Sequence, residues 1–289
     1  MRKTRLILIL ILLNVFFISC STDDSSESQE PEPNETFKLV KSEIVNDNFK
    51  SDYTYNSDNL LSSWIGTHPN FGYEIDYVYN PNGTLNQNHY REIGTGNYTQ
   101  DSFFTYDNNG NLTSFNNVVS SPINDYISLT YSSNLITLIG TIEGNSNVTI
   151  NLETNSSGLI TKLIEDNNYT TFEYDANGNI IIVKNYNNNN VLLTTYDIGY
   201  DQNINPFYGQ MESIYIERFI EFFYPFDGIY ISGFEGYSFP FLKNNIVSIS
   251  ENANAISNYT YSYDIENYPI NVNEDYSGNT FQFDITYYE

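Results

Sequence analysis

The sequence of 289 residues carries 36 acidic and 11 basic side chains, which give a net charge of −25 and a pI near 4.1. Binding of nucleic acid needs a positive face for the phosphates, so this charge argues against a nucleic-acid partner and against electrostatic adhesion to anionic lipid. The length suits one large domain or two modest ones. Tyrosine (27) and phenylalanine (19) are abundant, and both residues favour strands.

Residues 1–20 have the pattern of an export signal. The basic segment RKTR precedes an apolar run, residues 6–18, which is too short to span a bilayer as a helix. The segment ends at Cys20, the single cysteine of the sequence, so no disulfide can form within the chain. Residues 17–20, FISC, resemble the bacterial lipobox, although Phe17 departs from its usual leucine. The resemblance implies lipidation of Cys20 and attachment to the membrane through that lipid; the alternative is an ordinary signal peptide that contains a cysteine.

Residues 21–36, STDDSSESQEPEPNET, follow this signal. They lack apolar periodicity and contain two prolines and many acids, so they predict a disordered acidic tether. An acidic cluster directly behind the cysteine resembles the signal that sends lipoproteins of the Bacteroidota to the outer face of the outer membrane. The resemblance implies an outer-membrane lipoprotein exposed at the cell surface; the alternative is a solvated linker that faces the periplasm.

Residues 37–289 contain short runs in which apolar and polar side chains alternate. The runs YEIDYVY (73–79) and FQFDITY (281–287) are examples. Period-two alternation with one polar face is typical of half-buried antiparallel strands. We therefore expect one β domain over residues 37–289.

Two nearly identical heptapeptides, YDNNGNL (106–112) and YDANGNI (174–180), join such runs. The aspartate can accept a hydrogen bond from a backbone N–H two residues on, the glycine supplies a positive φ, and the tyrosine belongs to the apolar face. The residues concerned are Tyr106, Asp107 and Gly110 in the first copy and Tyr174, Asp175 and Gly178 in the second. Weaker variants recur about every 25 residues, a period that suits one hairpin per repeat in an up-and-down meander.

The motif Tyr-Asp-x-x-Gly-Asn-Leu/Ile resembles the YD repeat of Rhs-type proteins, whose hairpins wind into a spiralling sheet. Together with the lipoprotein signal and the tether, it resembles a group of Bacteroidota lipoproteins with a porin-like β fold, the DUF4595-like group. Residues 200–207, YDQNINPF, and the pair Tyr268-Pro269 look like further marks of that group. The resemblance covers most of residues 37–289.

The pattern predicts an all-β antiparallel meander of hairpins that forms a curled sheet or a soluble barrel. The aromatic and aliphatic face is expected to point inward. A membrane-inserted barrel is disfavoured. Spanning strands need about 9–11 residues with an apolar lipid-facing side, and the alternating runs of this sequence are expected to form shorter strands.

Residues 201–245 interrupt the repeat. Residues 210–223 place apolar side chains at helical spacing and predict the one helix of the fold, which Tyr224-Pro225 would end. An aromatic, glycine-rich segment, residues 226–241, follows. One interpretation is that the helix plugs the curled sheet and its aromatic residues join the core. The other is an aromatic platform for a glycan or peptide, because tyrosine offers a flat apolar ring with a polar tip. The platform would contain Tyr215, Phe219, Tyr230, Phe234 and Tyr237. Trp64 has the same two interpretations.

Catalytic and metal-binding motifs are sparse. The two histidines, His68 and His89, stand in unrelated contexts, so no metal site, triad or cofactor is predicted. Asp107-x-Asn109 and Asp175-x-Asn177 are similar to the start of a calcium loop, but the glycine falls too early and the closing glutamate is missing.

Three hypotheses about function follow. The first is a lipid-anchored envelope protein without enzymatic activity, acting as a scaffold or as a binding module for a glycan or another envelope protein. The second is a polysaccharide-acting enzyme that uses an Asp/Glu pair. The third is a purely structural surface or adhesin component.

Overall fold

The computed structural model describes residues 38–289 apart from 47, 95–97, 120–123, 143 and 225–235. The predicted signal peptide and tether, Cys20 included, therefore lie outside the described residues. Within residues 37–289 the chain forms one compact unit. In the described part of the chain, none of the helices has the length and hydropathy of a membrane-spanning segment.

The described residues of this unit form eighteen strands. They are β1 (Val40–Val45), β2 (Phe49–Tyr55), β3 (Leu61–His68), β4 (Phe71–Tyr79), β5 (Leu85–Ile93), β6 (Thr99–Tyr106), β7 (Leu112–Val119), β8 (Asp125–Ser132), β9 (Leu135–Ile142), β10 (Asn145–Thr154), β11 (Ile160–Glu165), β12 (Asn168–Tyr174), β13 (Ile180–Tyr186), β14 (Leu192–Ile204), β15 (Asn244–Glu251), β16 (Asn254–Tyr263), β17 (Pro269–Tyr276) and β18 (Asn279–Tyr287). The expected all-β architecture is confirmed.

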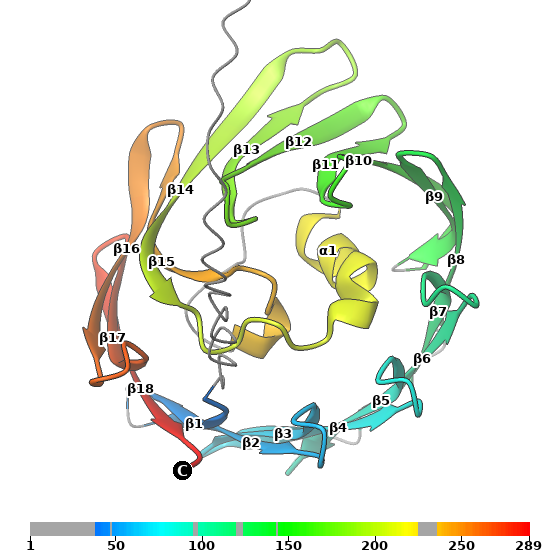
Figure 1. Ribbon diagram of the computed structural model, residues 1–289. Helices are drawn as coiled ribbons and strands as arrows, with labels where there is room; N and C mark the ends of the chain where they lie inside the picture. The colour runs from blue at the N-terminus through cyan, green and yellow to red at the C-terminus, as the bar shows by residue number, and fades with distance from the viewer. Residues whose placement is uncertain (1–37, 47, 95–97, 120–123, 143, 225–235) are drawn as a thin grey trace, which may run out of the picture. The chain divides into compact units, whose positions relative to one another are not determined.

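The strands form a single closed sheet. Each strand pairs antiparallel with its neighbours in the sequence, and β18 returns to pair with β1, for example Phe283 with Val45 (Figure 1). The predicted up-and-down meander is thus confirmed. Of the two forms that the sequence left undecided, a curled sheet or a barrel, the structure shows the barrel. Closure removes the unpaired sheet edges that would otherwise recruit other strands.

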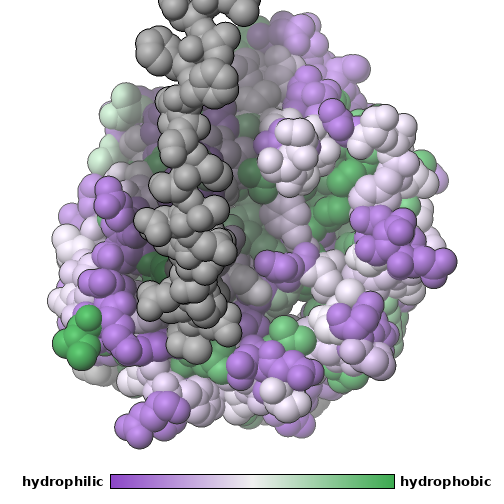
Figure 2. Space-filling model, in the orientation of Figure 1, coloured by the Kyte–Doolittle hydropathy of each residue, from purple (hydrophilic) through white to green (hydrophobic). Residues whose placement is uncertain are grey.

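The alternating pattern places apolar side chains on the inner face of the barrel. Leu85, Ile150, Leu152, Ile160 and Val183 are all 0% exposed. Burying one such side chain stabilises the fold by about 1.5–3 kcal/mol. In Figure 2 hydrophilic residues gather along the near rim, and hydrophobic surface shows further inside.

The interruption in the repeat supplies the contents of the barrel. It contains η1 (Glu212–Ile214), α1 (Tyr215–Phe223) and η2 (Gly236–Ser238). Figure 1 shows α1 inside the ring of strands. The ring centroid of Phe219 lies 4.8 Å from that of Phe172 on β12, and that of Phe223 lies 5.0 Å from it. The predicted helix is confirmed, although α1 begins at Tyr215 rather than at residue 210, and it ends where extended Tyr224 precedes a proline.

Both copies of the heptapeptide form turns between strands. Asp107 Oδ1 accepts hydrogen bonds from the backbone N–H groups of Asn109 at 2.8 Å and Asn111 at 2.9 Å. Gly110 has φ +85°, a conformation that a residue with a Cβ adopts only under strain. Asp175 and Gly178 repeat this arrangement between β12 and β13.

At the rim where these turns lie, a tyrosine fastens the hairpin; it is the tyrosine that opens the motif, except at Tyr261 and Tyr287. Its hydroxyl donates to the backbone carbonyl at the start of the preceding strand, at distances of 2.6–2.8 Å. The pairs are Tyr55 with Val40, Tyr79 with Leu61, Tyr106 with Leu85, Tyr131 with Leu112, Tyr174 with Ile160, Tyr200 with Ile180, Tyr261 with Ile246, and Tyr287 with Pro269. We call these bonds the tyrosine latches.

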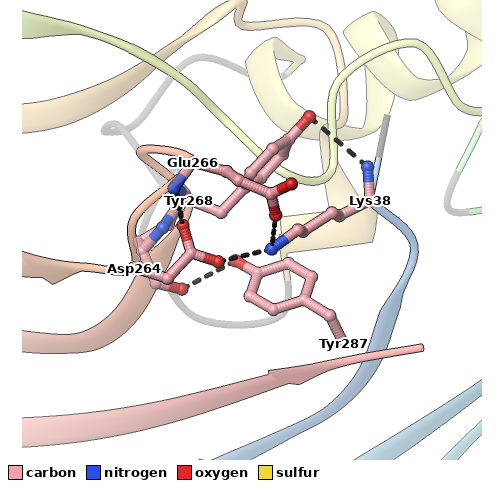
Figure 3. A network of polar contacts seen from close by, with 6 residues as sticks. Lys38, Asp264, Glu266, Tyr268 and Tyr287 are labelled. Atoms are coloured by element: carbon pink, nitrogen blue, oxygen red, sulfur yellow. Dashed lines mark hydrogen bonds and ion pairs between the residues drawn. The ribbon is translucent and has the colours of Figure 1, made fainter. Parts of the chain in front are cut away.

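The chain is also fastened where it enters β1. Lys38 Nζ lies 2.6 Å from Asp264 Oδ2 and forms a second ion pair with Glu266, both in the turn before β17 (Figure 3). Its ammonium lies 5.5 Å from the ring centroid of Tyr268 and 5.8 Å from that of Tyr287. These contacts link the N-terminal end of the described chain to the last two hairpins, beside the β1–β18 seam.

Candidate functional site

A pocket of about 360 Å³ lies inside the barrel, between α1 and the wall formed by β3–β6. We call it the lumen pocket. Its wall contributes Trp64, Tyr73, Tyr77, Asn88, Tyr90, Tyr98, Gln100 and Ser102, and the interruption contributes Met211, Ile214, Arg218, Glu221, Tyr237 and Ser238. The pocket therefore combines aromatic rings, amides and charges around one space.

Strand register brings the polar wall residues to the inner face. Ile75 on β4 pairs with Tyr90 on β5, which pairs in turn with Gln100 on β6. Directly paired residues share a face of the sheet, so all three point into the lumen. Asn88 and Ser102 form the next paired row, beside buried Tyr77. At this part of the wall the inner face changes from aliphatic to polar.

Aromatic rings line the pocket as a continuous row. The ring centroids of Trp64 and Tyr73 are 5.6 Å apart with an interplanar angle of 76°. Tyr73 stacks on Tyr90 at 5.8 Å and 22°, and Tyr90 meets Tyr98 edge-on at 5.8 Å. Trp64 Nε1 donates to Ser51 Oγ at 3.1 Å, which fixes the indole. The row presents aromatic surface and phenol groups to the pocket.

Helix α1 brings two charged side chains, Arg218 and Glu221, to the pocket, and Glu217 contacts the first of them. The Arg218 guanidinium donates to both carboxylate oxygens of Glu217, at 2.8 and 2.9 Å, and also pairs with Glu221. The Glu217 side chain is 5% exposed and that of Glu221 is 56% exposed. Confinement within the barrel raises the pKa of the Glu221 carboxyl, and Arg218 opposes that rise. Both carboxylate oxygens of Glu217 are thus occupied by the arginine, whereas the more exposed Glu221 can still accept hydrogen bonds from a bound molecule.

The structure corrects part of the expected aromatic platform. Phe219 is 0% exposed and Tyr237 is 1% exposed, so their rings belong to the core and offer no exposed platform to a ligand. The core interpretation of these two residues therefore prevails. Tyr230 and Phe234 lie outside the described residues. Tyr215 is half-buried and lines a second pocket, near the turns.

The histidines and turn aspartates have structural partners. His68 stacks on Phe71 with ring centroids 4.7 Å apart, and His89 Nδ1 lies 2.8 Å from Asp101 Oδ1 on the outer face. Both carboxylate oxygens of Asp107 accept hydrogen bonds within their own turn. Among the described residues, no group of three or more histidine, cysteine, aspartate or glutamate side chains is placed to hold a metal ion.

Sequence reasoning did not single out Asn88, Gln100, Arg218 or Glu221. The available signal for the first two was a polar residue at an inward position of an alternating run. For Arg218 and Glu221 it was their charge among the apolar residues of the predicted helix, which also contains Glu217.

No family model matches this chain, and no curated protein matches it. Among solved structures it is similar to a porin-like protein from Bacteroides vulgatus ATCC 8482, with a TM-score of 0.42, 11% identity, and coverage of 86% of this chain and 99% of that chain. A porin-like protein from Bacteroides uniformis ATCC 8492 gives a TM-score of 0.35, 12% identity, and coverage of 87% and 99%. The structure of TcdB2-TccC3 gives a TM-score of 0.34 and 11% identity, with coverage of 80% of this chain and 13% of that chain. These scores assign no function, and membership of the DUF4595-like group stays a prediction.

Proposed function

We propose that this chain is a lipid-anchored envelope protein without enzymatic activity that binds a neutral glycan in its lumen pocket. The observation that carries the proposal is the composition of that pocket, in which stacked tyrosine rings face amide side chains and a half-exposed carboxylate. Sugars present apolar ring faces and many hydroxyl groups. Aromatic rings pack against the former, and amide and carboxylate oxygens accept hydrogen bonds from the latter.

The charges favour a neutral ligand over an acidic one. Arg218 balances Glu217, so the carboxylate of Glu221 leaves the pocket with an excess of negative charge. The net charge of the chain, −25, acts in the same direction. Uronic-acid polymers and other polyanions would be repelled.

The outer face of the wall supports attachment by a lipid rather than by insertion of the strands. Asp76, His89 and Asp101 form a directly paired row on that face, and Glu173 pairs there with Lys184. Membrane barrels place apolar residues outward, and these polar and charged pairs on the outer face depart from that pattern. A lipid on Cys20 would tether such a barrel to the envelope while its wall stays in water.

The geometry of the carboxylates supports binding over hydrolysis. A glycosidase needs one carboxyl group held protonated by its surroundings and a second that remains ionised. Here both oxygens of Glu217 accept hydrogen bonds from Arg218, and among the described lining residues of the pocket Glu221 is the only carboxylate, so it has no second carboxylate beside it to complete a catalytic pair. A purely structural role is the second candidate, and the observation that favours it is the closed wall with its tyrosine latches.

Tryptophan fluorescence tests the proposal directly, because Trp64 is the single tryptophan and lines the pocket. Titration of the full chain with neutral and acidic oligosaccharides should shift the emission only with neutral ones. Gln100→Ala should weaken that binding about tenfold through the loss of a buried hydrogen bond. Asp101→Ala is the matched control, since Asp101 is the next residue on β6 and faces outward.

Three outcomes would count against the proposal. No response to any glycan would favour the structural role or a protein partner. Equal weakening by both substitutions would show that the effect is not specific to the pocket. Chromatography of a bound glycan after incubation should show an intact molecule, and shortened products would favour the enzyme hypothesis.

A further inference from the structure

A second pocket, of about 260 Å³, lies near the turns that contain Gly158 and Gly178. We call it the rim pocket. Its lining includes Tyr174, Tyr208, Glu212, Tyr215, Phe239 and Phe241. Pockets for drug-sized ligands have volumes of about 300–1,000 Å³, so this one suits a small group. It does not share a lining residue with the lumen pocket.

The aromatic rings of the rim pocket stand at steep angles to one another. The ring centroids of Tyr215 and Phe241 are 5.0 Å apart with an interplanar angle of 77°. Those of Phe239 and Phe241 are 5.1 Å apart with an angle of 82°. These rings pack edge to face against one another, and all three line the rim pocket, so a group bound there contacts more than one ring.

The electrostatic character of the rim pocket is negative. The face of each ring carries the negative part of its quadrupole and attracts cations within about 6 Å of the centroid. Glu212 lines the same pocket and is exposed, and no lysine or arginine is among the lining residues that the structure describes. Burial raises the pKa of Tyr215 to about 12, so its ring stays neutral at physiological pH.

We propose that the rim pocket binds a small organic cation of the quaternary ammonium class, in contact with Tyr215, Phe239 and Phe241 and balanced by Glu212. A quaternary ammonium group donates no hydrogen bonds, so the mainly apolar walls desolvate it without leaving a donor unpaired. Its positive charge matches both the ring faces and the net charge of −25. This proposal is independent of the glycan proposed for the lumen pocket.

The test compares choline with its neutral isostere 3,3-dimethylbutan-1-ol, which has the same shape and no charge. Isothermal titration of the full protein in detergent should show choline binding at least about tenfold more tightly, as expected for a desolvated cation–π contact. Equal affinity for the two compounds, or no binding of choline, would overturn the proposal.

Two variants locate the site. Phe241→Leu keeps an apolar side chain and removes the ring, so it should weaken choline binding about tenfold while hardly changing any affinity for the isostere. Glu212→Gln alters only an exposed side chain and should weaken choline binding several-fold, with less loss at high salt. Full choline affinity in both variants would show that the cation binds elsewhere and would overturn the assignment.

Discussion

At the scale of single residues, the tyrosine latches explain why the turn motif begins with tyrosine rather than with any apolar residue. Tyr79 donates its hydroxyl to the Leu61 carbonyl at 2.8 Å. Tyr79→Phe keeps the ring and removes that bond, so the free energy of unfolding should fall by about 1 kcal/mol. Urea unfolding of the full chain measures the change.

Tyr126→Phe provides the control, because the Tyr126 ring is 55% exposed and forms no latch. Its effect on the free energy of unfolding should stay within about 0.5 kcal/mol. Equal effects of the two substitutions would show that the latch hydroxyls do not stabilise the hairpins.

At the scale of elements, burial decides which ion pair fixes α1. Arg218 contacts both Glu217 and Glu221, but the first side chain is 5% exposed and the second 56% exposed. Removing one partner of a buried pair leaves an uncompensated charge, so Glu217→Gln should lower the free energy of unfolding by about 3 kcal/mol. Glu221→Gln should lower the free energy of unfolding by well under about 1 kcal/mol, because exposed ion pairs contribute little. Parallel urea titrations compare them, and a larger loss from Glu221→Gln would refute this ranking.

Elements were largely predictable because their signals are local. Alternation marked the strands, the Asp-x-x-Gly spacing marked the turns, and helical spacing marked α1. The pairing of β18 with β1 was not predictable, since residues such as Val45 and Phe283 carry no local mark of their partnership. The lumen pocket was missed for the same reason, because Gln100 and Arg218 meet only when β6 and α1 are placed in space. The latches were not predicted, because each tyrosine hydroxyl donates to a carbonyl on the preceding strand and not to one on its own strand.

At the scale of the whole molecule, alkaline pH is expected to open the barrel through its latches. Burial raises the pKa of Tyr106 and Tyr131 to about 12. Tyrosine in an unfolded chain has a pKa of about 10. The folded protein therefore holds these protons more tightly. The stability that they contribute is complete below about pH 10 and is lost as the pH rises from about 10 to about 12.

Ionised latches would also place phenolates against backbone carbonyls, where they can no longer donate a hydrogen bond. Because the latches recur around one rim, their loss weakens neighbouring hairpins together. Tyrosinate absorbance and far-ultraviolet circular dichroism, followed over the same pH series, should therefore change in one steep step. A gradual rise in tyrosinate absorbance with an unchanged strand signal would contradict this cooperativity. It would mean that the ladder hydrogen bonds and the inner apolar face hold the barrel closed without the latches.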